Sequence, residues 1–376
     1  MVQPTGITLA HNDRPLWDVF CHVVDNLGDI GVCWRLATNL AARGQRVRLW
    51  MDQPEPLRWM APGALEGAHP WIEVIPWTTP LPPGFCETLG PAQVWVETFG
   101  CHPPEEAQAA LAAQIAVGAA PPVWINLEYL SAESYVERSH GLPSPVMSGA
   151  LKGLGKWFFY PGFTATTGGL LREADLLSRQ AAFDDHAWLR QMSLPATSAQ
   201  RVSVFCYESA PLRELLLGAT TEDHAVEWLI TSGKAAQAVR AAAANTNLEK
   251  SGCLHFLPAL SQHEFDHLLW VCDLNLVRGE DSLVRAIWAG RPFVWHIYPQ
   301  EDNAHHAKLE AFLDWIEAPE SLRRFHHRWN GMDDEPVLPG WEALKEWQAC
   351  TRIARHRLFA QSDLSSQLIE FVNKRR

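Results

Sequence analysis

Residues 17–44, WDVFCHVVDNLGDIGVCWRLATNLAARG, contain the pattern that decides the fold. The apolar run Trp17–Val24 predicts a buried strand, and the polar stretch Asp25–Asp29 predicts a loop. From Ile30 to Arg43 apolar residues recur on one helical face, and a glycine follows where the helix is expected to end. A buried strand that passes directly into a helix is the repeating unit of open parallel sheets.

Strand–helix units continue in two runs, which predict two consecutive open α/β domains. In the first run we expect a helix at Ala107–Val117 and strands at Arg46–Met51, Ile72–Ile75, Gln93–Val96, Val123–Leu127 and Lys156–Tyr160. In the second run we expect strands at Arg201–Tyr207, Glu227–Thr231, Cys253–Leu257, Leu274–Val277 and Phe293–His296. Helices are expected at Pro211–Leu217, Ala235–Ala244, Gln262–Val271, Ser282–Ala289 and, near the C-terminus, Trp341–Val372. Ligands of such domains bind at the carboxyl ends of the strands.

The composition limits the classes of function. The 376 residues, 47% of them hydrophobic, suffice for two cores, and the eighteen tryptophans are expected mainly inside them. The formal net charge of −12 argues against tight binding to nucleic-acid phosphates or to anionic membranes. It is compatible with a cationic acceptor, although such a charge also serves solubility alone.

Several motifs are absent from the sequence. The eight cysteines form no CxxC pair, and the histidines form no HExxH, so we expect no metal site. GxGxxG, Walker A and GxSxG motifs are also missing, which leaves dehydrogenase, P-loop and esterase functions without support. The polar N-terminal segment has no signal-peptide core, and glutamine and proline interrupt the most apolar stretch, so a reduced, cytoplasmic compartment is expected.

Two aspartates, Asp25 and Asp29, lie where the first strand passes into the first helix. Gly28 and Gly31 beside them permit a tight turn and the close approach of a ligand. Each aspartate also has a structural alternative, Asp29 as the helix N-cap and Asp25 as a turn former. Cap and function are equally open for Asp29, whereas Asp25 is the better candidate for chemistry because it directly ends the strand.

The segment 276–290, LVRGEDSLVRAIWAG, places Arg278, Glu280, Asp281 and Ser282 between an apolar strand and a helix. Backbone N–H groups at a helix start favour a phosphate, to which Ser282 and Arg278 add a hydroxyl and a positive charge. Glu280 is expected to hold a sugar hydroxyl or to orient a cationic acceptor. The alternative is a helix cap at Asp281 or Ser282 with solvated charges, but the crowding of polar groups at one strand end favours function.

Phe205, Tyr207, Gln262 and Phe265 lie near strand ends of the second run. Aromatic faces at such places can stack on a nucleobase, although core packing is the commoner fate of these residues.

Several motifs together resemble the EarP family of protein-arginine rhamnosyltransferases. They are VVDNLGDIGVCWRLA (23–37), NLEYLSAESYVE (126–137), LPSP (142–145), FFYPGFTATTGGLLRE (158–173) and FLPALSQHEFDHLLWVCDLNLVRGEDSLVRAIWAGRPFVWHIYPQ (256–300). The resemblance implies an α/β fold of the GT-B type, with two facing Rossmann-like domains and a cleft between them. The acceptor-binding domain is expected at 1–195, joined by a C-terminal helix at about 359–376, and the nucleotide-sugar-binding domain at 196–358.

The resemblance also implies an inverting glycosyltransferase that moves L-rhamnose from dTDP-β-L-rhamnose to an arginine of translation elongation factor P, activating it for ribosomes stalled at polyproline. Asp25 matches the family's candidate general base, Asp29 its second essential acid and Glu280 the glutamate of its RGEDS motif. The positions that match donor-binding residues are Phe205, Tyr207, Gln262, Phe265, Arg278, Asp281 and Ser282. The nucleotide sugar is a co-substrate, and no cofactor, metal, nucleic acid or membrane is expected.

The acceptor sets one chemical difficulty, because a guanidinium with a pKa of about 12.5–13.8 is charged and a poor nucleophile. We therefore infer that Asp25 orients one nitrogen and accepts its proton late, as the bond to the anomeric carbon forms. Two alternatives stay open: a GT-B enzyme with a different acceptor, and a non-catalytic module that binds an elongation factor. The acidic set Asp25, Asp29 and Glu280 on facing domains argues against mere binding.

Overall fold

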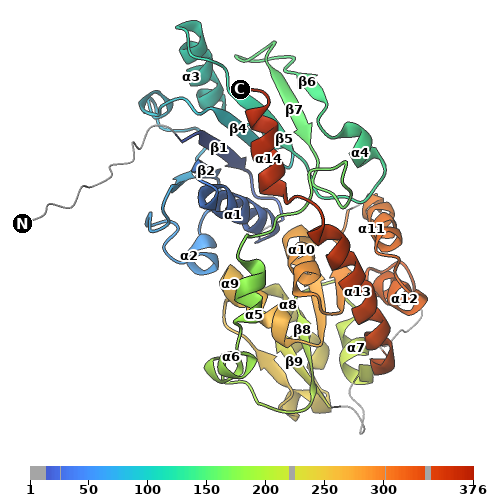
Figure 1. Cartoon of the computed structure of the whole chain (residues 1–376). Helices are drawn as coiled ribbons and strands as arrows, with labels where there is room; N and C mark the ends of the chain where they lie inside the picture. The colour runs from blue at the N-terminus through green and yellow to red at the C-terminus, as the bar shows by residue number, and fades with distance from the viewer. Residues whose placement is uncertain (1–13, 26, 220–224, 301, 335–339) are drawn as a thin grey trace, which may run out of the picture.

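Two β-sheets organise the chain (Figure 1). The structure, a computed structural model, describes residues 14–25, 27–219, 225–300, 302–334 and 340–376. The first sheet consists of β1 (Leu16–Cys21), β2 (Arg46–Met51), β3 (Ile72–Pro76), β4 (Val94–Thr98), β5 (Val123–Leu127), β6 (Pro143–Pro145) and β7 (Gly155–Phe159). The second consists of β8 (Gln200–Val204), β9 (Val226–Ile230), β10 (Leu254–Phe256), β11 (Leu274–Arg278) and β12 (Phe293–His296).

The strand order is β3-β2-β1-β4-β5-β7-β6 in the first sheet and β10-β9-β8-β11-β12 in the second. All pairs are parallel except the edge pair β6–β7. All the strands expected from the sequence are confirmed, with ends displaced by a few residues. We call the part of the chain built on the first sheet the first half and the part built on the second sheet the second half. The parallel arrangement places the carboxyl ends of β1 and β11 at the boundary between these halves.

Helices cover both sheets. The first half contains α1 (Leu27–Ala42), α2 (Leu57–Met60), α3 (Glu105–Ala116) and α4 (Tyr135–Ser139). The later helices are α5 (Leu176–Ala181), α6 (Asp185–Gln191), α7 (Leu212–Ala219), α8 (Lys234–Ala243), α9 (Gln262–Val271), α10 (Gly279–Ala289), α11 (Ala304–Trp315), α12 (Glu320–Trp329), α13 (Leu344–Phe359) and α14 (Leu364–Asn373). Short 3₁₀ turns lie at Cys86–Thr88, Asn247–Lys250 and Trp341–Ala343. Among the described residues, no helix has the length and apolar character needed to cross a membrane.

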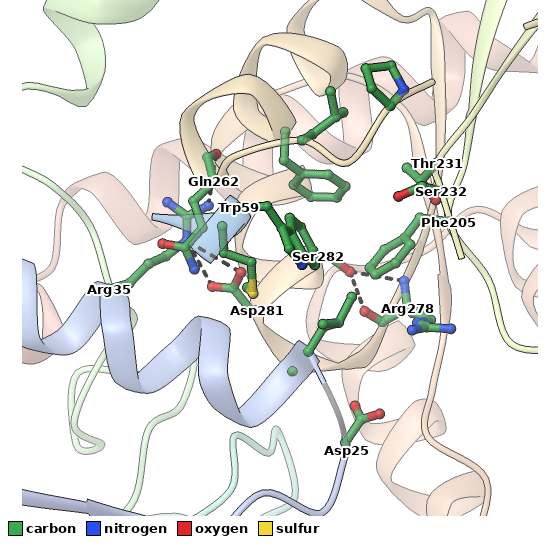
Figure 2. Close-up of a pocket in the computed structure, with 16 residues that line it drawn as sticks. Asp25, Arg35, Trp59, Phe205, Thr231, Ser232, Gln262, Arg278, Asp281 and Ser282 are labelled. Atoms are coloured by element: carbon green, nitrogen blue, oxygen red, sulfur yellow. Dashed lines mark hydrogen bonds and ion pairs between the residues drawn. The ribbon is translucent and has the colours of Figure 1, made fainter. Parts of the chain in front are cut away.

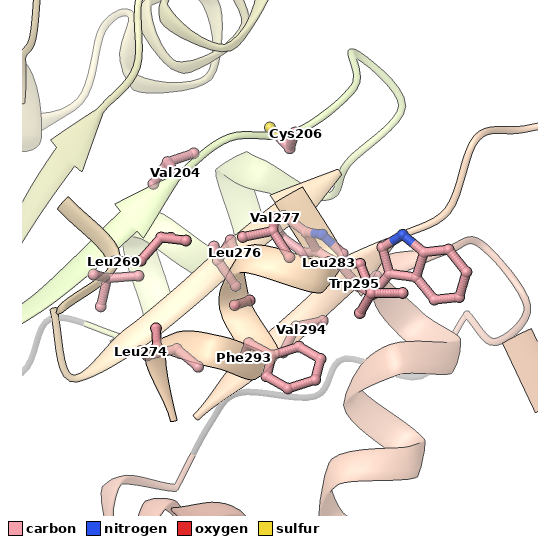
Figure 3. Packing of buried hydrophobic residues seen from close by; sticks show 14 of the residues in the cluster. Val204, Cys206, Leu269, Leu274, Leu276, Val277, Leu283, Phe293, Val294 and Trp295 are labelled. Carbon is pink, nitrogen blue, oxygen red and sulfur yellow. The ribbon is translucent and has the colours of Figure 1, made fainter. Parts of the chain in front are cut away.

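The cores follow from the strand sequences. Every residue of β1, β4 and β11 is buried, as expected of central strands that are covered on both faces. In the second half, β11 packs its Leu276 and Val277 among Val204, Val294 and Trp295 (Figure 3). Most of the tryptophans are buried, which confirms that they mainly fill the cores.

The sequence led us to expect one helix at Trp341–Val372, but these residues form two helices, α13 and α14. Asp363 begins a new helix, α14, by accepting a hydrogen bond from the Ser366 N–H at 3.0 Å. Helix α13 contributes Trp347 to the core of the second half, whereas α14 contributes Leu368 to the core of the first. The chain therefore returns to the first sheet at residues 360–363 (Figure 1).

The chain passes between the halves twice, outward near residues 170–172 and back near residues 358–364, and these two passages lie against each other. The guanidinium of Arg172, on the outgoing passage, donates to the carbonyl oxygens of Leu358 at 3.2 Å and Gln361 at 3.1 Å on the returning one. Leu364 N–H donates to Leu170 O at 2.9 Å. Beyond the outgoing passage, Trp188 of α6 already packs against the second half, so residues before 196 contact both halves.

Two helix starts differ from expectation and bear on the site. Helix α1 begins at Leu27 rather than at Ile30, so Asp29 lies in its first turn and is not its N-cap. Helix α10 begins at Gly279 rather than at Ser282, because Gly279 reverses the chain with a φ of +66° immediately after β11.

Candidate active site

Asp25 lies at the boundary of the two halves, and its carboxylate meets α10 of the second half. It does not directly end the first strand as expected, because β1 ends at Cys21, four residues earlier. Two glycines make room for it. A Cβ on Gly28 would lie 2.7 Å from Asp25 Oδ2, and a Cβ on Gly279 would lie 3.0 Å from the same oxygen. Side chains are therefore excluded on both sides of this carboxylate, and its position depends on both halves of the chain.

The hydroxyl of Tyr207, three residues after the end of β8, donates a hydrogen bond to Asp25 Oδ2 at 2.9 Å. Burial raises the pKa of Asp25 to about 6, while this hydrogen bond and the charge of Arg278 oppose the rise. The nearby carboxylates of Asp29 and Glu280 raise this pKa further. A carboxylate with a pKa of about 6 is a better proton acceptor than an ordinary aspartate, and it is still mostly ionised when the pH is above its pKa.

Asp29 has a different environment, although it lies only one helical turn away. Its Oδ2 accepts hydrogen bonds from the backbone N–H groups of Val24, at 2.8 Å, and Asp25, at 2.9 Å. Burial raises the pKa of Asp29, and these two N–H groups oppose the rise. Asp29 thus fixes the backbone that carries Asp25, a role that neither the cap nor the direct catalytic interpretation anticipated.

A pocket of about 670 Å³, partly open to solvent, lies between the two halves (Figure 2). It gathers most of the residues that the sequence proposed for the donor, with Asp25 at one end. Its lining includes Asp25, Phe205, Gln262, Phe265, Arg278, Asp281 and Ser282. Tyr207 is not part of this lining, because its hydroxyl turns toward Asp25.

Arg278 is the cation of this pocket that belongs to the second half. Its guanidinium lies close to two aromatic rings, 4.5 Å from the centroid of Phe205 and 4.8 Å from that of Tyr207. Its Nη1 donates to Cys206 O at 3.1 Å, which leaves further N–H groups for a ligand. Phe205 also meets Phe265 edge to face, with centroids 5.5 Å apart, so two aromatic rings border the pocket.

Ser282 stabilises the start of α10. Its Oγ accepts from the Arg278 N–H at 3.0 Å and donates back to the Arg278 carbonyl oxygen. The alternative of a helix cap at Asp281 or Ser282 is therefore wrong: Arg278 is at the N-cap position, and Ser282, within the first turn, bonds both of its backbone groups. Its hydroxyl is engaged within the protein and is not a free donor.

Glu280 joins the two halves. Its Oε2 accepts from the backbone N–H of Leu130, which follows β5 of the first sheet, at 2.8 Å. Its Oε1 lies 2.5 Å from Nζ of Lys308 on α11. Both carboxylate oxygens are thus held, one by each half, and the group is positioned rather than solvated.

Asp281 and Gln262, both expected to contact the donor, face α1 of the first half. Asp281 forms an ion pair with Arg35 Nε at 3.0 Å, and Gln262 Nε2 donates to Gly31 O at 2.9 Å. Arg35 also contacts Asp266, at 3.3 Å, and so joins a buried set of opposite charges that includes Glu173 and Arg285. Asp281 and Gln262 still line the pocket, but their bonds to Arg35 and Gly31 join the two halves.

A second cleft, of about 1280 Å³, opens on the other side of Asp25. Its lining contains the carboxylates of Asp25, Asp29, Glu133 and Glu280. Aromatic rings border the same cleft: Tyr129 stacks on Phe99 with centroids 4.7 Å apart, and Tyr135 and Tyr298 are exposed there. Within the part of the chain that the structure describes, Lys308 is the one lysine or arginine in its lining. The cleft therefore suits a positively charged group.

Three lining residues had not been singled out from the sequence. Trp59 of α2 and Arg35 of α1 bring the first half into the donor pocket, and Lys308 reaches the acidic cleft from α11. Arg35 contacts a residue 246 positions away in the chain, so no local pattern marks it. Arg35 is also buried although it is a charged residue outside the apolar face of α1, so its burial was not expected from the sequence.

Comparison with known proteins gives a consistent set of relatives. The sequence profile of the family described as Elongation-Factor P (EF-P) rhamnosyltransferase EarP matches residues 17–373. A protein-arginine rhamnosyltransferase of Pseudomonas putida is 40% identical, over 95% of this chain and 98% of its own. Another, from Neisseria meningitidis, is 33% identical, over 95% of this chain and 96% of its own.

Solved structures agree with the sequence relatives. A structure that concerns EarP-mediated arginine glycosylation of translation elongation factor EF-P is 29% identical, with a TM-score of 0.61 over 96% of this chain and 99% of that chain. Spinosyn rhamnosyltransferase SpnG is 12% identical, with a TM-score of 0.53 over 95% of this chain and 99% of that chain, a likeness of fold alone. The expected GT-B fold is confirmed.

Proposed function

Because the chain belongs to the EarP family of elongation-factor-P rhamnosyltransferases, we propose that it transfers L-rhamnose from dTDP-β-L-rhamnose to an arginine side chain of elongation factor P, which activates the factor for ribosomes stalled at polyproline. It is a glycosyltransferase. One observation supports the assignment of the reaction to this site: the Asp25 carboxylate lines both the pocket between the halves and the acidic cleft. A donor in the one and a cation in the other would meet at this carboxylate.

The donor's nucleotide fits the pocket between the halves. Phe205 and Phe265 offer faces for the base, and Arg278 with the N-terminus of α10 offers charge for the diphosphate. The two acids in the first turn of α10 would repel a diphosphate, but Arg35 pairs with Asp281, and Lys308 pairs with Glu280. The helix start is therefore close to neutral, and Arg278 adds a positive charge. We place the diphosphate there rather than on the acidic turn after β1.

The acceptor arginine fits the acidic cleft. A guanidinium is attracted by several carboxylates and stacks favourably on aromatic rings such as that of Tyr129. With Glu280 already paired to Lys308, Asp25, Asp29 and Glu133 remain to receive the guanidinium, and of these Asp25 also lines the donor pocket. The acceptor would thereby be directed to the carboxylate that adjoins the donor pocket.

The chemistry follows from the pKa values involved. A free guanidinium holds its proton far too strongly for an aspartate to remove it before reaction, since its pKa is about 12.5 or higher. As one nitrogen bonds to the anomeric carbon, that nitrogen becomes acidic, and Asp25 accepts its proton. The carbon–oxygen bond to the diphosphate breaks in the same displacement, and dTDP leaves on the opposite face. A single displacement inverts the anomeric centre and yields an α-linked rhamnosyl arginine.

We propose that no metal ion takes part, because Arg278 and the start of α10 supply the charge that the leaving dTDP needs. Among the described residues, no group of three or more His, Cys, Asp or Glu is arranged to hold a metal ion. We also propose a cytoplasmic location, where translation factors act. All eight cysteines are free, as suits a reducing compartment.

Mass spectrometry of elongation factor P tests the function. Incubation with the enzyme and dTDP-β-L-rhamnose should add one deoxyhexose mass to one arginine, and the Asp25→Asn variant should add none. Modification of a different acceptor would favour the alternative of a GT-B enzyme with another substrate. A stable complex with the factor and no modification by any nucleotide sugar would favour a non-catalytic binding module.

A further inference from the structure

We propose that Tyr207 is a positioning residue for the transfer reaction: its hydroxyl holds the Asp25 carboxylate in place and couples that placement to the occupied donor pocket. The inference rests on the proposed function, in which Asp25 accepts the proton. It differs from the expectation that Tyr207 contacts the nucleotide. The hydroxyl donates to Asp25 Oδ2 at 2.9 Å, and the residue does not line the pocket between the halves.

The ring of Tyr207 packs against two aromatic neighbours. It meets the imidazole of His296 edge to face at 5.2 Å and the ring of Tyr298 at 5.6 Å. His296 is itself fixed, because its Nδ1 accepts from the Tyr207 backbone N–H at 3.3 Å and its Nε2 lies 3.2 Å from Ser209 Oγ. In this packing the hydroxyl of Tyr207 reaches Asp25 Oδ2.

The link to the donor runs through Arg278. Its guanidinium lies within 5 Å of two ring centroids, that of Phe205, which lines the donor pocket, and that of Tyr207, which does not. A diphosphate that binds Arg278 would fix the guanidinium, and with it the ring that carries the hydroxyl. Because Asp25 belongs to the first half and Tyr207 to the second, the hydrogen bond also requires the halves to be together. The base would thus be placed for reaction when the donor is bound.

The hydroxyl can only donate in this position. Burial, together with the charge of Asp25, raises the pKa of Tyr207 far above its usual range, so the phenol keeps its proton at every working pH. A donor to a carboxylate favours the ionised form and lowers its pKa. The other groups that face Asp25 are Arg278 of β11, which also lowers its pKa, and Asp29 of α1 and Glu280 of α10, which raise it.

Tyr207→Phe removes the hydroxyl and keeps the ring, and three measurements test the result. In transfer assays across pH 5 to 9, the acid limb of kcat should move up by about one pH unit, because the base then loses its charge at a higher pH. At pH 8, kcat should fall about tenfold or more, since the carboxylate is no longer held. The dissociation constant for dTDP, measured by calorimetry, should change less than about threefold.

Phe205→Leu is the matched control, because it alters the other aromatic ring that contacts Arg278. It should weaken dTDP binding and leave the acid limb where it is. A Tyr207→Phe enzyme with the wild-type acid limb and kcat would overturn the inference, as would one that loses dTDP binding and kcat in parallel with an unmoved limb. Wild-type enzyme that fails to modify elongation factor P would instead refute the proposed function, so the two failures are distinguishable.

Discussion

Replacing Gly279 by alanine should impair transfer by displacing the proposed base. Gly279 has a φ of +66°, a conformation that costs an alanine about 1–2 kcal/mol. The new Cβ would lie 3.0 Å from Asp25 Oδ2 and 3.3 Å from the hydroxyl oxygen of Tyr207. Both contacts are shorter than ordinary van der Waals separation, so the carboxylate has to retreat by a few tenths of an ångström. Misplacement of a reacting group by 1 Å costs about 100-fold in rate, and we therefore expect kcat to fall about tenfold.

Gly290→Ala provides the control on the same helix. Gly290 lies at the other end of α10 with a φ of +69°, and a Cβ there would meet the flexible side chain of Arg355 at 2.9 Å. The conformational cost to stability should be similar in the two variants, measured as a lower melting temperature. At a temperature well below both transitions, rhamnose transfer followed by mass spectrometry should be normal for Gly290→Ala alone.

The reasoning would be refuted by a Gly279→Ala enzyme with the kcat of wild type. It would equally be refuted if both variants lost activity in proportion to their loss of stability, because the effect would then belong to the helix and not to the base. Calorimetry with dTDP should show that Gly279→Ala changes nucleotide binding less than it changes kcat.

Three further predictions concern the same site. Asp25→Asn should abolish transfer and leave dTDP affinity nearly unchanged in calorimetry; if Asp25→Asn transfers rhamnose and Asp29→Asn does not, the role of base moves to Asp29. Arg278→Ala should weaken dTDP binding by about 1.5–3 kcal/mol, the usual value of a hydrogen bond to a charged group. Ser282→Ala should weaken it less, because the Ser282 hydroxyl is already bonded to backbone groups. Equal losses of dTDP affinity in calorimetry would contradict this. Transfer should persist in EDTA, and an activity lost in chelator and restored by magnesium or manganese would show that a metal is required.

The two sheets could be predicted from the sequence because each central strand has a recognisable local pattern of apolar residues. Runs such as 17–24 and 274–277 are mainly apolar, and each is followed by a helical period, so strand position and order in the chain could be read directly. Helices α11 and α12, of 12 and 10 residues, were not predicted, and neither were the short elements. Strand β6 has three residues and α2 has four, too few for either period to be recognised.

The donor pocket was predicted better than the contacts inside it. Phe205, Phe265 and Arg278 follow strands or begin helices, so topology alone brings them to one edge of the second sheet. The partners of Asp281 and Glu280 could not be derived in this way. Arg35 lies 246 residues from Asp281, and its burial arises from packing between the two halves rather than from the amphipathic pattern of α1.

The helix starts were misjudged for a physical reason. Sequence rules place a cap at a serine or an aspartate, which led to Ser282 and Asp29. At α10 a glycine in the left-handed region turns the chain sooner, and Ser282 bonds backward to Arg278 from within the first turn. In the same way Asp29 bonds backward to Val24 and Asp25.

The paired passages between the halves determine how this enzyme can open. Arg172 ties the outgoing chain to the returning chain at Leu358 and Gln361, so both covalent connections lie at one place on the boundary. Two adjacent attachments define an axis, about which one half can rotate while sliding and separation are resisted. Such a rotation would separate Asp25 from Tyr207, Glu280 from Leu130, and Arg35 from Asp281 in one motion. A substrate would then enter a site whose acids are apart, and the same swing back would reassemble them around it.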